Sequence, residues 1–138
     1  MSAEDFVDTN VLLYLLSADT AKADRAEAVF QAGGVVSVQV LNEFTAVARR
    51  KLKLGWQDVA DVLDMVQSTC GVESLTLEGH TLGRELAVQY GFSVYDAMIV
   101  ASALVAGCTR LYTEDLQHGL QVRGQLRVCN PFAGVQPP

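Results

Sequence analysis

The order of short and long apolar segments restricts this chain to few folds. Short runs rich in Val and Leu, as in strands buried on both faces, alternate with longer runs whose apolar residues recur at helical spacing. The expected strands are Phe6–Val7, Val35–Val36, Val72–Leu75, Arg110–Tyr112 and Leu126–Val128. This alternation predicts a three-layer α/β/α fold, with a parallel sheet, helices on both faces and right-handed crossovers.

Helix boundaries follow from capping residues and glycines. Small polar residues precede several of the periodic runs, and glycine follows most of them, which are the usual start and stop signals of helices. The expected helices are Val11–Leu16 with Thr9 and Asn10 as caps, Lys22–Ala32, a long helix from Ser37 through Lys53, Gln57–Gln67, Leu82–Tyr90 and Val94–Ala106.

Composition and charge bound the class of protein. The chain has 138 residues, of which 50% are apolar and 19% charged, and it shows no repeat or linker, so we expect a single domain over residues 1–138. The net charge of −6 disfavours a general nucleic-acid binder but leaves room for an enzyme that acts on RNA. Four of the ten basic residues fall in one run, which is either a solvated helix face or a contact with RNA or a protein partner: Arg49, Arg50, Lys51 and Lys53.

The compartment is predicted from what the sequence lacks. The longest uncharged stretch, Ala97–Thr109, is too short to span a bilayer, and the acidic N-terminus does not have the layout of a signal peptide. Cys70, Cys108 and Cys129 form an odd set without CxxC spacing, which favours reduced thiols. We therefore expect a cytoplasmic protein with no membrane partner.

Four acids interrupt or border the apolar segments, namely Asp8, Glu43, Asp96 and Asp115. A carboxylate in such a place is costly unless it has a partner. Asp8 and Asp115 follow strands, while Glu43 and Asp96 lie on helices that begin at the carboxyl edge of the sheet, where such folds bind ligands. Four carboxylates on one rim would repel one another, so the pattern predicts a shared divalent cation.

Each acid also has a purely structural explanation. Asp8 can cap a helix, Glu43 can pair with a basic residue at the edge of the core, and Asp96 closes a capping box that opens at Ser93. Asp115 can cap a turn, and Glu114 beside it is the alternative fourth acid. The sequence also places two polar residues where they could orient a carboxylate, Asn10 and Thr113.

Two other classes of function stay open. One is a different Mg²⁺-dependent phosphoryl-transfer domain, although a dehalogenase-type phosphatase would have a DxD motif and this chain has Asn10 at the third position. The other is a non-catalytic module that binds RNA or a protein partner and keeps its acids for folding.

The chain resembles the PIN-domain ribonucleases over nearly its whole length. The resemblance rests on five segments in order: Phe6–Tyr14, Ser37–Phe44, Tyr95–Leu104, Leu111–Gly119 and Val128–Phe132. The subgroup that it resembles is the VapC-type toxins of type II toxin–antitoxin pairs. The resemblance implies a Rossmann-like α/β/α sandwich, RNA cleavage dependent on Mg²⁺ or Mn²⁺, a homodimer and a cognate antitoxin.

The resemblance also assigns roles to individual residues. By motif, the catalytic acids are Asp8, Glu43, Asp96 and Asp115. We expect Asp8, Asp96 and Asp115 to bind one or two metal ions, and Glu43 to bind the ion or orient the attacking water.

Overall fold

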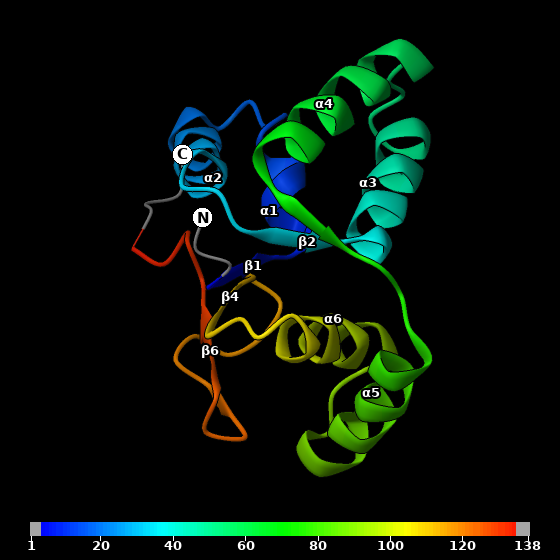
Figure 1. Ribbon diagram of the computed structural model, residues 1–138. Coiled ribbons are helices and arrows are strands. Elements are labelled where there is room, and N and C mark those ends of the chain that lie inside the picture. Colours follow the sequence, from blue (N-terminus) through cyan, green and yellow to red (C-terminus); the bar gives the residue numbers. More distant parts are fainter. Residues whose placement is uncertain (1–3, 135–138) are drawn as a thin grey trace.

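The computed structural model describes residues 4–134, which fold around one six-stranded sheet (Figure 1). The strand order is β3-β2-β1-β4-β6-β5, in which every neighbouring pair is parallel except β5 and β6. The strands are β1 (Asp5–Val7), β2 (Val35–Ser37), β3 (Gly71–Glu73), β4 (Arg110–Tyr112), β5 (Gln121–Val122) and β6 (Leu126–Cys129). The predicted α/β class with a largely parallel sheet is confirmed.

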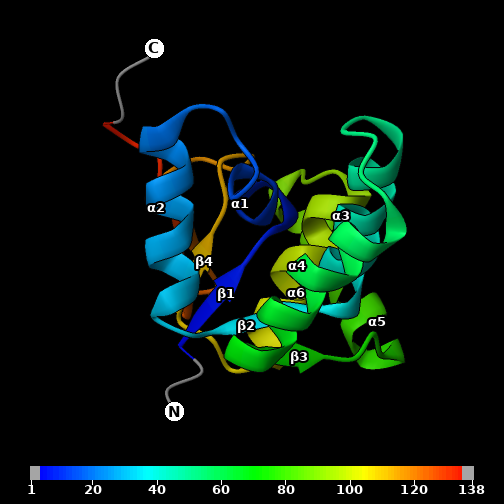
Figure 2. The ribbon, with the colours of Figure 1, turned by 90° about the horizontal axis from the view of Figure 1, so that it is seen from above.

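Six helices cover the two faces of the sheet. They are α1 (Thr9–Tyr14), α2 (Thr20–Gln31), α3 (Val38–Arg50), α4 (Trp56–Thr69), α5 (Leu77–Tyr90) and α6 (Val94–Val105). Helices α1 to α4 lie on one side of β1 and β2, and α5 and α6 pack together on the other side (Figure 1). Seen from above, β1 runs toward the region between α1, α3 and α6 (Figure 2).

Strands β1 and β2 bury every side chain except that of Asp5, which is partly exposed. Phe6, Val7, Val36, Leu111 and Val128 are fully buried, as the runs of Val and Leu predict for strands covered on both faces. The register pairs Val7 of β1 with Tyr112 of β4. The residues that follow these two strands, Asp8 and Thr113, therefore leave the sheet at the same level.

The sequence-based boundaries were wrong in several places. Helix α5 begins at Leu77 and not Leu82, because Thr76 caps it by accepting a hydrogen bond from the Gly79 amide at 3.0 Å. Strand β3 is Gly71–Glu73 and not Val72–Leu75, since these three residues complete the pairing with β2. Helix α3 ends at Arg50, before Lys53, whose φ of 56° is not helical.

Two further features differ from the prediction. Of the three candidate caps, Asp8, Thr9 and Asn10, it is Asp8 that caps α1, so the helix begins at Thr9 and not at Val11. The two-residue strand β5 was not predicted; it turns back through Gly124 to pair with β6.

Within residues 4–134, no single helix is both long enough and apolar enough to cross a membrane. Helices α5 and α6 are long and apolar enough only when taken together, and a bend of 119° lies between them.

Candidate active site

Three carboxylates from distant parts of the chain converge at the carboxyl edge of the sheet. One oxygen from each of Asp8, Asp96 and Asp115 lies within 4.8 Å of the others. Asp8 follows β1, Asp96 lies in the first turn of α6, and Asp115 lies in the loop after β4. Three of the four acids singled out in the sequence thus form one cluster.

Asp8 is the buried member of the cluster. Its Oδ1 accepts a hydrogen bond from the Thr9 amide at 2.7 Å, and its Oδ2 accepts one from Thr113 Oγ1 at 2.9 Å. Burial raises the pKa of Asp8 to about 6 even though both hydrogen bonds favour the charged form, and the negative charges of Asp115 and Glu43 add to the increase. Asp8 therefore caps α1 and belongs to the acid cluster at the same time.

Asp96 is brought to the cluster by the start of α6. Ser93 caps this helix, and its Oγ accepts a hydrogen bond from the Asp96 amide at 3.3 Å. Partial burial raises the pKa of the Asp96 carboxyl, and the charges of Asp115 and Glu43 raise it further. The hydrogen bond from Ser93 to the Asp96 side chain lowers this pKa, but burial and the neighbouring charges outweigh it.

Asn10 and Thr113 connect Asp8 to Asp115. The Nδ2 of Asn10 donates to Thr113 Oγ1 at 3.0 Å and to Asp115 Oδ2 at 3.1 Å, and it lies 3.4 Å from Asp8 Oδ2. Thr113 Oγ1 in turn accepts a hydrogen bond from the Asp115 amide at 3.1 Å. Both side chains therefore hold carboxylates in place.

Glu114 points away from the cluster. The Tyr14 hydroxyl hydrogen-bonds to the Glu114 carboxylate, with both oxygens 3.0 Å from it, while the Glu114 amide donates to Asn10 Oδ1 at 3.2 Å. Of the two adjacent acids, only Asp115 belongs to the cluster.

Glu43 lies beside the cluster and is not one of its three members. Its Oε2 accepts a hydrogen bond from Thr9 Oγ1 at 2.8 Å, and its Oε1 accepts one from Gln39 Nε2 at 2.7 Å. Glu43 and Asp115 both line a cavity of about 310 Å³. Sequence reasoning missed the contributions of Gln39 and Thr9. The spacing of Gln39, four residues before Glu43 on one helix, was the available signal.

No cationic side chain neutralises the cluster in the part of the chain that the structure describes. The ion pairs there are Arg110 with Asp5 at 2.8 Å and Arg123 with Glu85 at 3.5 Å. The acids at the site therefore repel one another without compensation from Lys or Arg.

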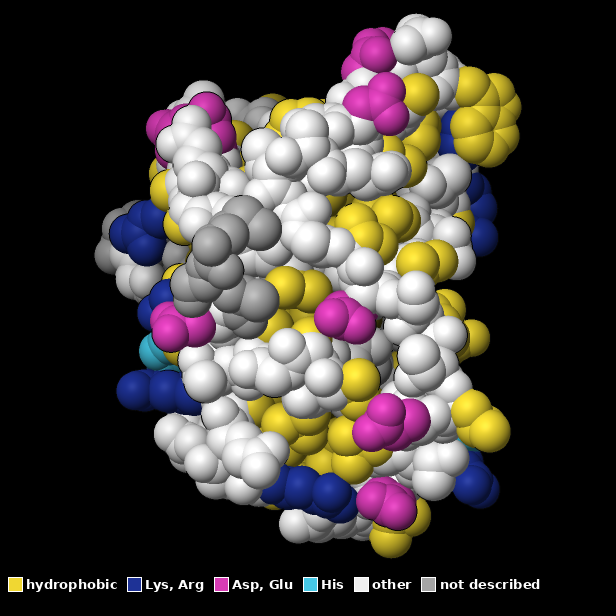
Figure 3. Space-filling view, in the orientation of Figure 1, with side chains coloured by type: hydrophobic (Ala, Val, Ile, Leu, Met, Phe, Trp, Pro, Cys, Tyr) yellow, Lys and Arg dark blue, Asp and Glu magenta, His cyan; other side chains and the backbone are white. Residues whose placement is uncertain are grey.

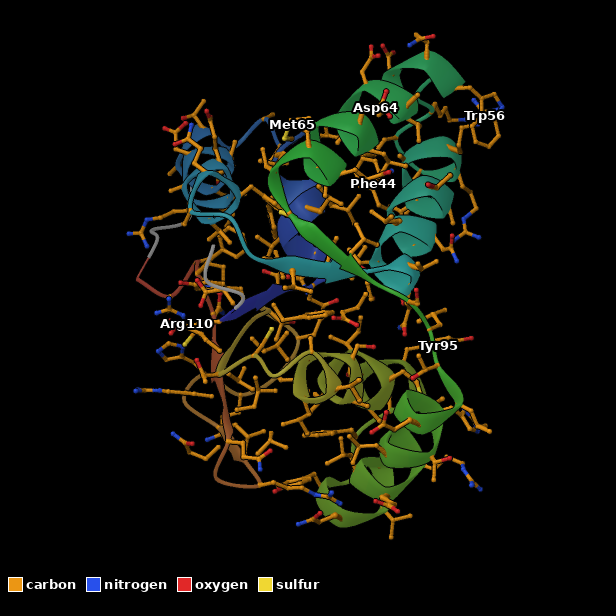
Figure 4. The ribbon with its side chains drawn as sticks, in the orientation of Figure 1. Phe44, Trp56, Asp64, Met65, Tyr95 and Arg110 are labelled. Carbon is orange, nitrogen blue, oxygen red and sulfur yellow. The ribbon has the colours of Figure 1, made fainter. Side chains whose placement is uncertain are left out.

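The basic run of α3 does not form one surface. Arg49 donates to the Leu54 carbonyl at 2.8 Å, and its guanidinium lies 4.4 Å from the ring centre of Trp56. Trp56 is 64% exposed at the start of α4 (Figure 4). Arg50, in contrast, lines the cavity that contains Glu43 and Asp115.

The other two basic residues of the run lie further from the cluster. Lys51 lines a neighbouring groove together with Tyr14 and Glu114, and Lys53 lies in the turn after α3. On the face seen in Figure 3, Lys and Arg are scattered near the margins and do not form a continuous patch.

The chain belongs to the PIN domain family, whose model matches residues 6–119. No curated protein matches the sequence in a direct comparison. Among solved structures, a toxin–antitoxin complex from Klebsiella pneumoniae is similar, with a TM-score of 0.69, 20% identity, and 92% of this chain and 97% of that chain covered.

Two further structures share the fold. One is the sarcin-ricin loop cleaving toxin VapC20 of Mycobacterium tuberculosis, with a TM-score of 0.65, 21% identity, and coverage of 80% and 91% of the two chains. The other is FitAcB from Neisseria gonorrhoeae, with a TM-score of 0.65, 15% identity, and coverage of 93% and 98%.

Proposed function

We propose that this protein is a metal-dependent endoribonuclease and the toxin of a toxin–antitoxin pair. The observation that carries the proposal is the convergence of Asp8, Asp96 and Asp115, with oxygens within 4.8 Å and no ion pair to Lys or Arg among the described residues. Structural ion pairs would explain isolated acids, but they do not explain three unpaired carboxylates at one point.

The donor set fits a hard divalent cation. All three groups offer oxygen, which Mg²⁺ and Mn²⁺ prefer, and none offers sulfur or imidazole nitrogen. Oxygens that bind one Mg²⁺ directly are separated by at most about 4.2 Å, twice the Mg–O distance. A spacing of up to 4.8 Å therefore suits an ion held partly through water. Mg²⁺ or Mn²⁺ bound there would lower the pKa of a water molecule and offset charge on the phosphate.

The protein side chains would divide the remaining work. Asp8, Asp96 and Asp115 would hold the cation, and Asn10 and Thr113 would keep Asp8 and Asp115 at a fixed separation. Glu43, fixed by Thr9 and Gln39, would orient the attacking water. Attack by water would leave a 5′-phosphate and a 3′-hydroxyl, so detection of a 2′,3′-cyclic phosphate would contradict this chemistry.

Arg50 is the basic residue placed to contact RNA. It lines the same cavity as Glu43 and Asp115, and it makes no ion pair or side-chain hydrogen bond with residues 4–134. A guanidinium there can bind a phosphate of the strand being cleaved. Lys51 and Lys53, which do not line that cavity, are candidates for contact with RNA further along the strand or with the antitoxin.

The partners in this proposal follow from the family resemblance. Similar chains have been crystallised in toxin–antitoxin complexes, among them the DNA-bound VapBC of Salmonella typhimurium, at 17% identity. We propose a cognate antitoxin, a homodimer, a cytoplasmic location and a single domain over residues 1–138. A co-expression pull-down with the adjacent reading frame and light scattering of the purified protein would test the first two.

The decisive experiment is cleavage of total RNA with Mg²⁺ or Mn²⁺ by wild type and by Asp96→Asn, purified identically. We expect cleavage by wild type only, abolished by a chelator. Equal cleavage by both would mean a contaminating nuclease or a wrong site.

A melting curve supplies a readout independent of RNA. If neither protein cleaves RNA and millimolar metal leaves the melting temperature of wild type unchanged, the protein is instead a non-catalytic binding module. Metal that binds only the folded state must raise the melting temperature by mass action.

A further inference from the structure

A second cavity lies next to the acid cluster at the carboxyl edge of the sheet. It holds about 210 Å³ and is lined by the link after β3, the first turn of α5 and the part of α6 from Met98 to Val105. Side chains lining it include Gln39, Glu73, Ser74, His80, Met98 and Ser102. Because Glu73 ends β3, which is parallel to β2, this cavity opens at the same edge of the sheet as Asp8.

Gln39 forms the wall between this cavity and the acid site. Its Nε2 donates to Glu43 Oε1 at 2.7 Å and to the Tyr95 carbonyl at 3.3 Å, and Tyr95 directly precedes Asp96. Figure 4 shows Tyr95 next to the segment that leads from β3 into α5. One glutamine side chain therefore lies between the cavity and Glu43.

Four of the polar side chains that line the cavity have no partner among the described residues. The side chains of Glu73, Ser74, His80 and Ser102 make no hydrogen bond or ion pair with any residue in 4–134. Met98 adds a thioether, which makes favourable contacts with aromatic rings. An apolar surface with a few convergent polar groups is the usual character of a small-ligand site.

Size and charge select the ligand. A volume of 210 Å³ lies below the roughly 300 Å³ at which pockets begin to hold drug-sized molecules, so it suits one ring system. Glu73 is the only Asp, Glu, Lys or Arg in the lining, so a phosphate would be repelled and an amino-bearing base edge attracted. Guanine alone among the RNA bases offers two adjacent N–H donors, at N1 and N2, to the two oxygens of one carboxylate.

We propose that this cavity binds a guanine base of the RNA, within two nucleotides of the scissile phosphate, through the carboxylate of Glu73. The inference rests on the proposed function because it makes the cavity a specificity site of the same nuclease. Sequence-specific proteins read single-stranded RNA in this way, by taking up an unstacked base and bonding its Watson–Crick edge.

A binding experiment tests the inference without cleavage. Asp96→Asn would be titrated with a uridine heptamer that carries one central guanosine, or inosine, which lacks the 2-amino group. We expect about tenfold tighter binding of the guanosine oligomer, the size of one charge-assisted hydrogen bond. Backbone amide shifts over residues 74–80 would locate the bound base.

The carboxylate is tested by matched variants in the same background. Glu73→Gln should reduce the preference for guanosine over inosine, because the amide loses the charge and one acceptor, whereas Glu78→Gln, which removes an exposed acid of α5 outside this cavity, should preserve it. No guanosine preference, or an equal preference in Glu73→Gln, would overturn the inference.

A cleavage experiment separates this inference from the proposed function. In wild type, mapped 5′-phosphate ends should show guanosine at one fixed position near the cut, and among the products of Glu73→Gln that enrichment should fall. Cleavage without any base enrichment would refute the cavity as a guanine site and leave the nuclease intact. A guanosine preference in binding, with no cleavage by wild type, would refute the nuclease and keep the base site.

Discussion

Asn10 Nδ2 lies 3.1 Å from Asp115 Oδ2, although the two residues are 105 positions apart in the chain. Asn10 also donates to Thr113 Oγ1, which donates to Asp8. These hydrogen bonds together connect the segments that follow β1 and β4. The arrangement of the acid cluster thus depends on a neutral amide that supplies donors to carboxylates on both strands.

Removal of this amide should weaken the metal site and leave the fold intact. We expect Asn10→Ala to lower the apparent affinity for Mg²⁺ by about 10- to 100-fold, the usual cost of losing a group that orients a metal ligand. Activity should recover at high metal concentration. Asn42→Ala on the exposed surface of α3 is the control, and an unchanged metal dependence in Asn10→Ala would refute the role.

The pKa of Asp8 predicts how stability depends on pH when metal is absent. Its folded pKa of about 6 lies above the unfolded value of 3.8, so the unfolded chain releases this proton first as the pH rises. Protonated Asp8 adds to the free energy of unfolding. This contribution is complete below pH 3.8 and is lost between about pH 4 and 6. At neutral pH the free energy of unfolding is lower by about 3 kcal/mol, because each unit of difference between the folded and unfolded pKa corresponds to 1.36 kcal/mol.

Asp8→Asn should therefore melt at a higher temperature than wild type in chelator at pH 7, and the difference should shrink at pH 4. The same variant should lose the rise in melting temperature that Mg²⁺ produces in wild type. A lower melting temperature for Asp8→Asn at pH 7 would mean that the carboxylate is stabilised by a group other than a metal.

The two adjacent acids after β4 should behave differently. Asp115→Asn should reduce RNA cleavage by more than about 100-fold because it removes a carboxylate from the metal cluster. Glu114→Gln should retain most of the activity, since its side chain contacts the Tyr14 hydroxyl and not the cluster. Equal losses in the two variants, measured at saturating metal, would contradict the assignment.

Arg50 should contribute to RNA binding through charge. In the Asp96→Asn background, Arg50→Ala should weaken binding of a uridine oligomer and reduce the slope of log affinity against log salt by about one unit. Lys53→Ala, outside the cavity that Arg50 lines, should change the slope less. Identical slopes in wild type and Arg50→Ala would show that this guanidinium does not contact phosphate.

Gly34 should tolerate no side chain. Its φ is +132°, and an added Cβ would lie 2.7 Å from the carbonyl oxygen of Asp5 in β1. We expect Gly34→Ala to destabilise the protein by about 2 kcal/mol or more, from backbone strain and this clash. Gly55→Ala, which meets nothing within 4 Å, should be close to neutral in a denaturant titration.

The sequence predicted the parts of the fold that have a strong periodic signal. Buried strands such as Phe6–Val7 stand out because both of their faces require apolar residues. The start of α5 was missed because Gly79 and His80 are poor helix formers, and the cap at Thr76 outweighs them. The strand β5 has two residues, too few for any pattern.

The acids of the site were predictable as a group, but their contacts were not. The topology brings Asp8, Asp96 and Asp115 to one edge of the sheet. The sequence predicts which edge this is, because parallel sheets bind ligands at the carboxyl ends of their strands. Which way a side chain turns depends on partners far away in the chain, as with Glu114 and Tyr14. The separation of Arg49 from Arg50 likewise depends on the position of Trp56, at the start of the next helix.

Both margins of the sheet end in very short strands, β3 with three residues and β5 with two. A margin of this length offers few unpaired amides and carbonyls to another extended chain. A chain with 50% apolar residues is thereby protected against growing into intermolecular sheets. The turn at Gly124 folds β5 back onto β6 and so also helps to keep the protein from aggregating.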